Sequence, residues 1–200
     1  FSEAAPRAGR PKALAGAARL KCVNSSVVVD AVVADLRASN VVTLVPSDAS
    51  LVVDATDNFE TRYLLNDVCV KHGLPLVYGG VIGARGMQAT FAPGGPCLRC
   101  VFPEPPEPGS QQTCESAGVL GPAVAVVGAL QAAAAMRFII EGELPRLLHE
   151  WDVWRGGSRT LALGERRADC PACAASRFEF LDARHGEDAA RVCGGHAVQV

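Results

Sequence analysis

Two Cys-x-x-Cys pairs form the strongest chemical pattern in this sequence. Cys97 and Cys100 stand in GGPCLRC, and Cys170 and Cys173 stand in ADCPAC. Each pair can bind one edge of a tetrahedral Zn²⁺ ion through two thiolates, so two pairs complete a closed, structural site. The alternatives are two disulfides or unrelated thiols. Because the start of the chain lacks the apolar core of a secretion signal, we favour zinc and expect a cytoplasmic protein.

Carboxylates follow a run of apolar strand-forming residues in VVDATDNFETRYLLND (Val52–Asp67). Such groups either start a helix or face a ligand, because burying them without partners is costly. Asp57 could hold Mg²⁺ on a nucleotide. Its alternative role is helix capping, which Asn58 could equally fill. Arg62, about one turn into the same predicted helix, could neutralise Asp57 or reach an anion.

Lys12 and Cys114 are weaker candidates. Lys12, in GRPKALAG, stands near the start of a predicted helix, where backbone N–H groups and a cation can both meet phosphate. The alternative for Lys12 is an ordinary solvated lysine. Cys114, in QTCESAGVLGP, precedes an apolar helix, and the neighbourhood of a helix N-terminus lowers a thiol pKa. The alternative for Cys114 is a small apolar residue.

The order of the predicted elements indicates an α/β domain with a largely parallel sheet. Ligands in such sheets lie at the carboxyl ends of the strands, where Asp57 is expected. GMQATFAP alternates like a strand at a sheet edge, and LHEWDVWRGGSRTLALGE resembles a hairpin that turns at Gly156 and Gly157. The predicted elements, in chain order, are a helix over 11–22, a strand over 25–36, a strand over 51–54 buried on both faces, a helix over 59–72, a strand in LPLVYGGVIG, an edge strand over 86–93, a loop over 103–112 and a hairpin over 148–165.

The hydrophobic content and the net charge of the chain bear on the kinds of function to expect. A chain that is 49% hydrophobic can bury a sizeable core, and its formal net charge of −2 gives no reason to expect nucleic-acid or membrane-surface binding. The segment from Ala117 to Met136 carries no charge and is long enough to cross a membrane. Its alanine and glycine content, with Gln131 and Pro122, instead predicts a buried, closely packed helix.

Six stretches together resemble the ThiF/MoeB family, the bacterial relatives of ubiquitin-activating enzymes. They are GRPKA, VVDATDNFETRYLLND, PLVYGG, CLRC, TCESAGVLGP and CPAC, in this order, and the resemblance covers about residues 1–173. It implies a Rossmann-like fold, with a mostly parallel sheet, an antiparallel extension and a structural zinc clasp. It also implies ATP- and Mg²⁺-dependent adenylation of the C-terminal glycine of a ubiquitin-like sulfur carrier of the ThiS/MoaD type, by a homodimer.

The resemblance assigns roles to individual residues. Lys12 matches the lysine that contacts the ATP phosphates, and Asp57 matches the aspartate that binds Mg²⁺. Asn58 and Arg62 belong to the same nucleotide-binding segment. Cys114 matches a cysteine that some members link covalently to the carrier. The four cysteines of the two pairs match the family's zinc ligands.

One family feature is absent from the sequence, namely the early glycine-rich GxGGxG-type loop with its following acidic and arginine-containing segment. The sequence therefore resembles the carboxyl-terminal part of such an enzyme, which we expect to be inactive alone. We expect a single domain, incomplete at its N-terminus, divided into 1–96 (nucleotide-binding remainder), 97–173 (zinc-clasped carrier-binding part) and a tail over 174–200. The alternatives are a non-catalytic zinc-bound carrier-binding module and, on the α/β pattern alone, a dinucleotide-binding oxidoreductase.

Overall fold

The structure, a computed structural model, describes residues 9–107 and 114–182. These residues fall into two compact units, one of residues 9–36 and the other of the described residues from 37 onward. The predicted loop residues 108–112 and most of the predicted tail lie outside the described residues. The expected single domain, with divisions at residues 96/97 and 173/174, stays a prediction.

The first unit contains one helix, α2 (Lys12–Val23), which confirms the helix predicted there. Pro11 precedes it as the N-cap residue. The strand predicted over 25–36 is wrong: within the described residues this segment forms no strand, and Val28 is 86% exposed. β-Branched residues favour a strand only where a neighbouring strand and a packed surface receive them. No described strand pairs with this segment.

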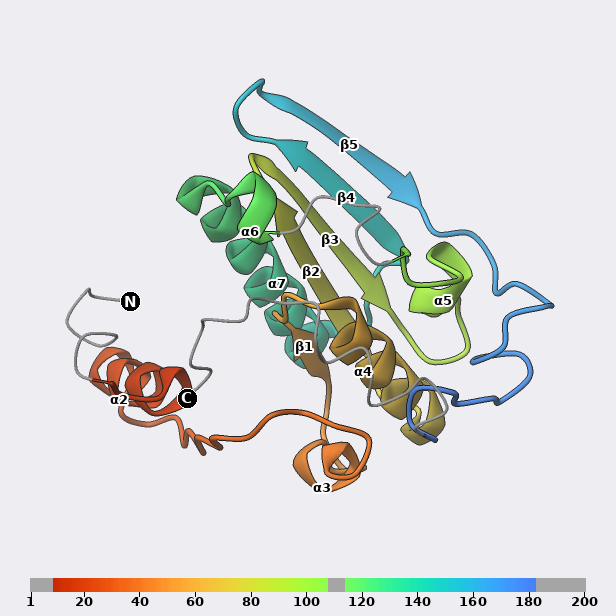
Figure 1. The fold of residues 1–200 in the computed structure, drawn as a ribbon, viewed down its shortest axis with the longest axis horizontal. Coiled ribbons are helices and arrows are strands. Elements are labelled where there is room, and N and C mark those ends of the chain that lie inside the picture. Colours follow the sequence, from red (N-terminus) through yellow and green to blue (C-terminus); the bar gives the residue numbers. More distant parts are fainter. Residues whose placement is uncertain (1–8, 108–113, 183–200) are drawn as a thin grey trace. The chain divides into compact units, whose positions relative to one another are not determined.

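The second unit is built on a five-stranded sheet with the order β1-β2-β3-β4-β5 (Figure 1). Strand β1 runs parallel to β2, and each of the other neighbouring pairs is antiparallel. The hairpin predicted over 148–165 is confirmed as β4 and β5, with Gly156 at a φ of 71° in its turn. The strands are β1 (Val52–Asp54), β2 (Leu76–Ile82), β3 (Arg85–Phe91), β4 (Leu147–Asp152) and β5 (Gly157–Ala162).

The predicted α/β fold with an antiparallel extension is confirmed. Contrary to the prediction, the described sheet is not mostly parallel, because one of its four neighbouring strand pairs is parallel and three are antiparallel. Strands β2 and β3 are joined only by Gly83 and Ala84. So short a connection permits an antiparallel pair, whereas a parallel pair needs a long crossover. The prediction of an edge strand over 86–93 is wrong. Strand β3 lies between β2 and β4, and Ala89 at its middle is fully buried.

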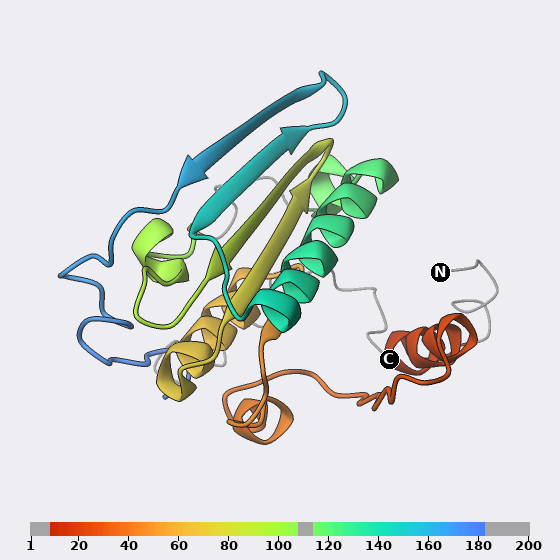
Figure 2. The ribbon, with the colours of Figure 1, turned by 180° about the vertical axis from the view of Figure 1, so that it is seen from behind.

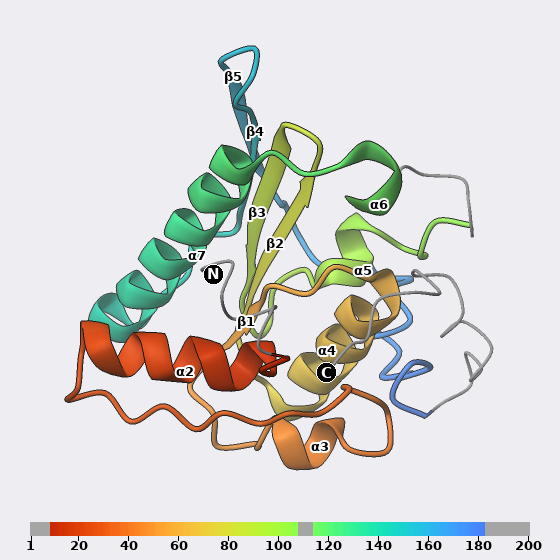
Figure 3. The same cartoon turned by 60° about the vertical axis from the view of Figure 1, so that its left-hand side comes forward.

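Helices cover both faces of the sheet (Figure 3). Helices α4 (Phe59–His72) and α5 (Leu98–Val101) lie on one face, and α7 (Gly121–Glu141) packs on the other against β2 and β3, on the near side in the view from behind (Figure 2). Two further helices, α3 (Val41–Leu44) and α6 (Cys114–Ala117), are short. Apolar side chains from α4 and the sheet form much of the core, including Tyr63, Leu64, Val68, Leu76, Val77 and Ala89.

The ends of α4 follow from local chemistry, as predicted. The Asn58 Oδ1 atom accepts a hydrogen bond from the Thr61 N–H group at 2.8 Å, which satisfies one of the free donors of the first turn. Gly73 ends the helix at a φ of 67°, in the left-handed region that glycine enters without strain. Only four residues, 55–58, therefore separate the end of β1 from the start of α4.

Helix α7 packs through one face, which corrects the prediction of a buried helix. Ala123, Val127 and Gln131 are buried, whereas Ile139 and Ile140 are 73% and 81% exposed. By length and composition this helix could cross a membrane. In its most apolar stretch of 18 residues, 17% is buried. Its contacts with β2 and β3 arise because those strands carry Gly79 and Gly86 where α7 crosses them. Strand β1 is likewise less buried than predicted, because it lies at the edge of the described sheet.

A substitution at Gly79 would test the close packing of α7 on β2. A Cβ atom at Gly79 would lie 2.5 Å from the Cδ atom of Gln131, whose amide donates to the backbone carbonyls of Asp54 and Val77. We expect Gly79→Ala to lower the free energy of unfolding by about 1–3 kcal/mol through overpacking. Urea denaturation would measure the change.

Gly128→Ala is the matched control. Gly128 lies in α7, and a Cβ atom added there would have no neighbouring atom within 4 Å, so alanine should leave stability unchanged or raise it by about 0.5–1 kcal/mol. Equal effects of the two substitutions would contradict the packing described for Gly79.

Candidate functional site

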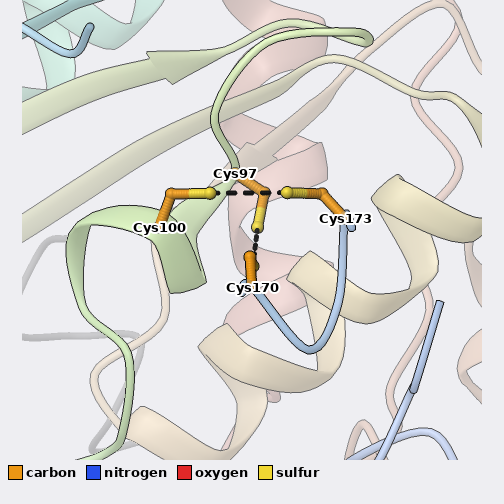
Figure 4. Close-up of side chains that lie close together, drawn as sticks. All are labelled: Cys97, Cys100, Cys170 and Cys173. Atoms are coloured by element: carbon orange, nitrogen blue, oxygen red, sulfur yellow. Dashed lines mark hydrogen bonds between the residues drawn. The ribbon is translucent and has the colours of Figure 1, made fainter. Parts of the chain in front are cut away.

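The two Cys-x-x-Cys pairs meet in space, although 73 residues separate their first cysteines (Figure 4). The four Sγ atoms all lie within 4.8 Å of one another. Cys97 is the residue before the first turn of α5 and Cys100 lies inside α5, whereas Cys170 and Cys173 belong to a turn in the later segment. The backbone N–H groups of Ala174 and Ala175 both donate to the Cys170 carbonyl, which closes that turn.

The geometry of the four cysteines suits a metal ion. The closest sulfur pairs are Cys97–Cys170 at 3.6 Å and Cys100–Cys173 at 3.4 Å, and all four thiols are free. A disulfide would need a separation of about 2.05 Å. Tetrahedral Zn–S bonds of about 2.3 Å place sulfur atoms about 3.8 Å apart, close to these distances. The donor set therefore fits zinc, and four protein ligands leave no position for a substrate.

The pKa values of the thiols indicate what a metal ion would have to displace. Burial and the neighbouring Cys170 and Cys100 raise the pKa of the Cys97 thiol to about 12. Burial, with the Cys100 thiol, likewise raises the pKa of Cys173 above its ordinary value. At Cys170 burial raises the pKa, but hydrogen bonds with the backbone and thiol of Cys173 outweigh burial and the pKa is lowered. Protonated thiols are poor ligands, so a metal ion that binds Cys97 and Cys173 must displace protons. We therefore expect metal binding at this cluster to release protons.

The two acidic residues of the turn between β1 and α4 differ in burial and in hydrogen bonding. The Asp54 side chain is 1% exposed, and its Oδ1 atom accepts hydrogen bonds from the Thr56 N–H group at 2.9 Å and the Thr56 hydroxyl at 2.7 Å. Burial raises the pKa of Asp54, although Arg62 and the Thr56 bonds oppose it. Asp57 is exposed, and no described residue forms a hydrogen bond or an ion pair with its carboxylate. Asp57 is thus the acid of this turn that stays available to a ligand.

Arg62 takes a position that the sequence left open. Its Nη1 atom donates to the Tyr78 hydroxyl and its Nη2 atom donates to the Thr56 carbonyl, both at 2.6 Å. The guanidinium also lies 4.9 Å from the centre of the Tyr78 ring. Arg62 therefore links the turn between β1 and α4 to strand β2. Tyr78 carried no signal in the sequence beyond its place in a strand.

Lys12, Cys114 and Asn58 complete the predicted site residues. Lys12 is exposed and is the first residue of α2, as predicted, in the first unit. Cys114 is the first residue of α6, and its side chain lies outside the described part of the structure. Asn58 caps α4, so its carbonyl oxygen already has a partner. The nucleotide-binding roles of Lys12, Asn58 and Arg62 stay predictions.

Comparison with known proteins gives consistent matches. The sequence profile of the ThiF family matches residues 4–172. The chain is 38% identical over 192 residues to the "Sulfur carrier protein ThiS adenylyltransferase" of Bacillus subtilis, covering 95% of this chain and 56% of that protein. It is 44% identical over 176 residues to the "SAMP-activating enzyme E1" of Haloferax volcanii, covering 87% of this chain and 64% of that protein. The chain thus spans less than two thirds of the length of each of these relatives.

Solved structures agree on the fold. Escherichia coli MccB, in its complex with MccA-N7isoASN, superposes with a TM-score of 0.69 at 18% identity. The superposition covers 82% of this chain and 52% of that chain. At this level of identity the likeness shows a shared fold alone.

Removal of one cysteine tests the metal cluster. Cys170 is fully buried among the other three ligands, so Cys170→Ser should reduce the zinc content from about one ion per chain to a small fraction of that. Cys22→Ser is the control, because Cys22 is exposed and lies outside the cluster. Mass spectrometry of the native protein measures the metal. Equal zinc in both variants would mean that these cysteines do not hold it.

Proposed function

This chain belongs to the ThiF family, and we propose that it is the carboxyl-terminal part of an ATP-dependent adenylyltransferase that activates a ubiquitin-like sulfur carrier of the ThiS/MoaD type. The observation that carries the proposal is the 38% identity, across 95% of the chain, to a protein described as a ThiS adenylyltransferase. Two further relatives, described as a SAMP-activating E1 and a sulfur carrier protein adenylyltransferase, support the same class of substrate.

The proposed reaction is acyl adenylation. The C-terminal glycine carboxylate of the carrier attacks the α-phosphorus of ATP, and the bond to the β-phosphate breaks. Acyl-adenylate and pyrophosphate are the products. Negative charge accumulates on the triphosphate during the attack, so cationic groups and a metal ion lower the barrier.

Asp57 is the residue to which we assign the Mg²⁺ ion of the nucleotide. It follows β1 at the carboxyl end of the strand, the edge where α/β sheets bind ligands. Its carboxylate is exposed, whereas the carboxylate of Asp54 is buried in the turn. Bound Mg²⁺ would supply charge neutralisation of the phosphates, and one or two protein carboxylates are its usual anchors.

The remaining assignments follow the resemblance. Lys12 would contact the ATP phosphates. Asn58 and Arg62 would contribute to the nucleotide site at least through the turn that they hold, because Asn58 caps α4 and Arg62 joins Thr56 to Tyr78. Zn²⁺ on the four cysteines would join the two cysteine-bearing segments without taking part in the reaction. A homodimer, a Gly-Gly terminus on the carrier and a cytoplasmic location complete the proposal.

The glycine-rich phosphate loop of the family is missing from this sequence, and the chain spans 56% of its Bacillus subtilis relative. We therefore propose that residues 1–200 alone bind ATP poorly. Backbone N–H groups of such a loop cradle the phosphates, and no side chain described above replaces them.

ATP–pyrophosphate exchange in the presence of a Gly-Gly-ended carrier tests the activity. It should be measured on these 200 residues and on the longest product of their reading frame. In an active product, Asp57→Ala should reduce exchange by at least about 100-fold, because a charge-stabilising group for the transition state is lost. Glu60→Gln is the matched control, since Glu60 is an exposed acid in the first turn of α4.

Undiminished exchange in the Asp57→Ala variant would remove the metal role of that residue. Carrier binding without exchange, in the longest product, would instead favour a zinc-bound binding module.

Cys114 is proposed to form the covalent link to the carrier: its thiolate would attack the carbonyl carbon of the acyl-adenylate, a thioester would form, and AMP would leave. Incubation with ATP and carrier should give an adduct that thiols release, seen as a shift on a non-reducing gel. Cys114→Ser should abolish the adduct, whereas Cys22→Ser, which changes an exposed cysteine, should keep it. An adduct that persists in the Cys114→Ser variant would rule out that residue.

A further inference from the structure

Two adjacent polar residues are buried in the middle of α4. Asn66 is 1% exposed and Asp67 is fully buried, among the apolar side chains of Leu64, Leu65 and Val68. A buried amide or carboxyl group costs free energy unless it is hydrogen-bonded. The hydrogen-bond partners of these two side chains therefore identify the segments that α4 holds in place.

Asn66 binds the first cysteine-bearing segment. Its Oδ1 atom accepts a hydrogen bond from the Leu98 N–H group at 2.9 Å. Leu98 lies between Cys97 and Cys100 and is itself 2% exposed, so no water can replace the bond without rearrangement. This contact fixes the backbone of the first cysteine pair without involving any sulfur atom.

Asp67 binds the second cysteine-bearing segment. Its Oδ2 atom accepts a hydrogen bond from the Phe180 N–H group at 3.0 Å, seven residues after Cys173. The Phe180 ring packs against Tyr63 of α4, with 4.9 Å between the ring centres. The chain that leaves the second cysteine pair is thus held on the same helix.

An ion pair between a buried arginine and a half-buried glutamate joins the two segments directly. Arg99, next to Cys100 and 5% exposed, donates from Nη2 to the Glu179 carboxylate at 2.9 Å. Its guanidinium lies 5.4 Å from the centre of the Phe180 ring. The first segment, the second segment and α4 therefore form one connected set of polar contacts, buried except at Glu179.

We propose that Asn66 and Asp67 are positioning residues for the metal centre, each fixing one of the two cysteine-bearing segments on α4. The inference rests on the metal role proposed for the four cysteines. Ligands that are distant in sequence must be brought together at an entropic cost, and contacts behind the ligands hold them in place. On α4 one residue holds each segment, and the Asn66 amide also lies 3.5 Å from the Asp67 Oδ1 atom.

Zinc release tests the proposal. The zinc-loaded protein is mixed with a chromogenic zinc chelator, and the rate of release is followed. We expect Asn66→Ala to accelerate release about 10-fold, in line with the effect of residues that orient metal ligands. Lys71→Ala is the matched control on the same helix, because Lys71 is exposed, and it should release zinc at the wild-type rate.

Asp67→Asn supplies a rescue comparison. Asparagine retains a side-chain oxygen for the Phe180 N–H group, so it should release zinc more slowly than Asp67→Ala. Circular dichroism confirms that each variant is folded. If Asn66→Ala does not fold, Asn66→Ser, which keeps a shorter acceptor, is measured in its place with the same expectation of faster release.

The outcomes separate this proposal from the metal assignment. Wild-type protein that binds no zinc overturns the role of the cysteines. Wild-type protein that binds zinc, with Asn66 and Asp67 variants that release it at the rate of Lys71→Ala, overturns the positioning role alone.

Discussion

Burial of polar groups on and beside α4 is the constraint on which the second unit depends. Asp54, Asn66 and Asp67 are each at most 1% exposed, and every one of them accepts a backbone hydrogen bond from a segment that must stay in place. An unpaired group at any of these positions would cost about 1–3 kcal/mol. The same bonds close the turn that leads to Asp57 and place both cysteine pairs.

This arrangement connects the two parts of the proposed enzyme through one helix. The N-terminal end of α4 follows the turn that carries Asp57, and its middle contacts both cysteine-bearing segments. Eight residues separate Asn58 from Asn66, which corresponds to about 12 Å along an α-helix. A packed helix of this length is stiff, so the four-cysteine cluster and the proposed nucleotide edge share a rigid element.

On the face of the sheet covered by α7, the contact depends on close packing on glycine residues. There α7 approaches β2 and β3 closely because Gly79 and Gly86 have no side chains, and Gln131 donates to backbone carbonyls of Asp54 and Val77. The bond to Asp54 adds a second restraint at the end of β1. Both faces of the sheet therefore stabilise the strand end from which Asp57 follows.

The sequence by itself determined what depends on near neighbours or on donor chemistry. Asn58 and Gly73 marked the ends of α4, Gly156 marked the hairpin, and the two Cys-x-x-Cys pairs indicated a metal cluster. Only the tertiary structure decided what depends on partners distant in the chain. The residues over 25–36 have the composition of a strand, yet no described strand pairs with them. The sequence could not separate buried Asp54 from exposed Asp57, or show that Arg62 contacts Tyr78, because exposure and long-range contacts arise only when the sheet and helices pack.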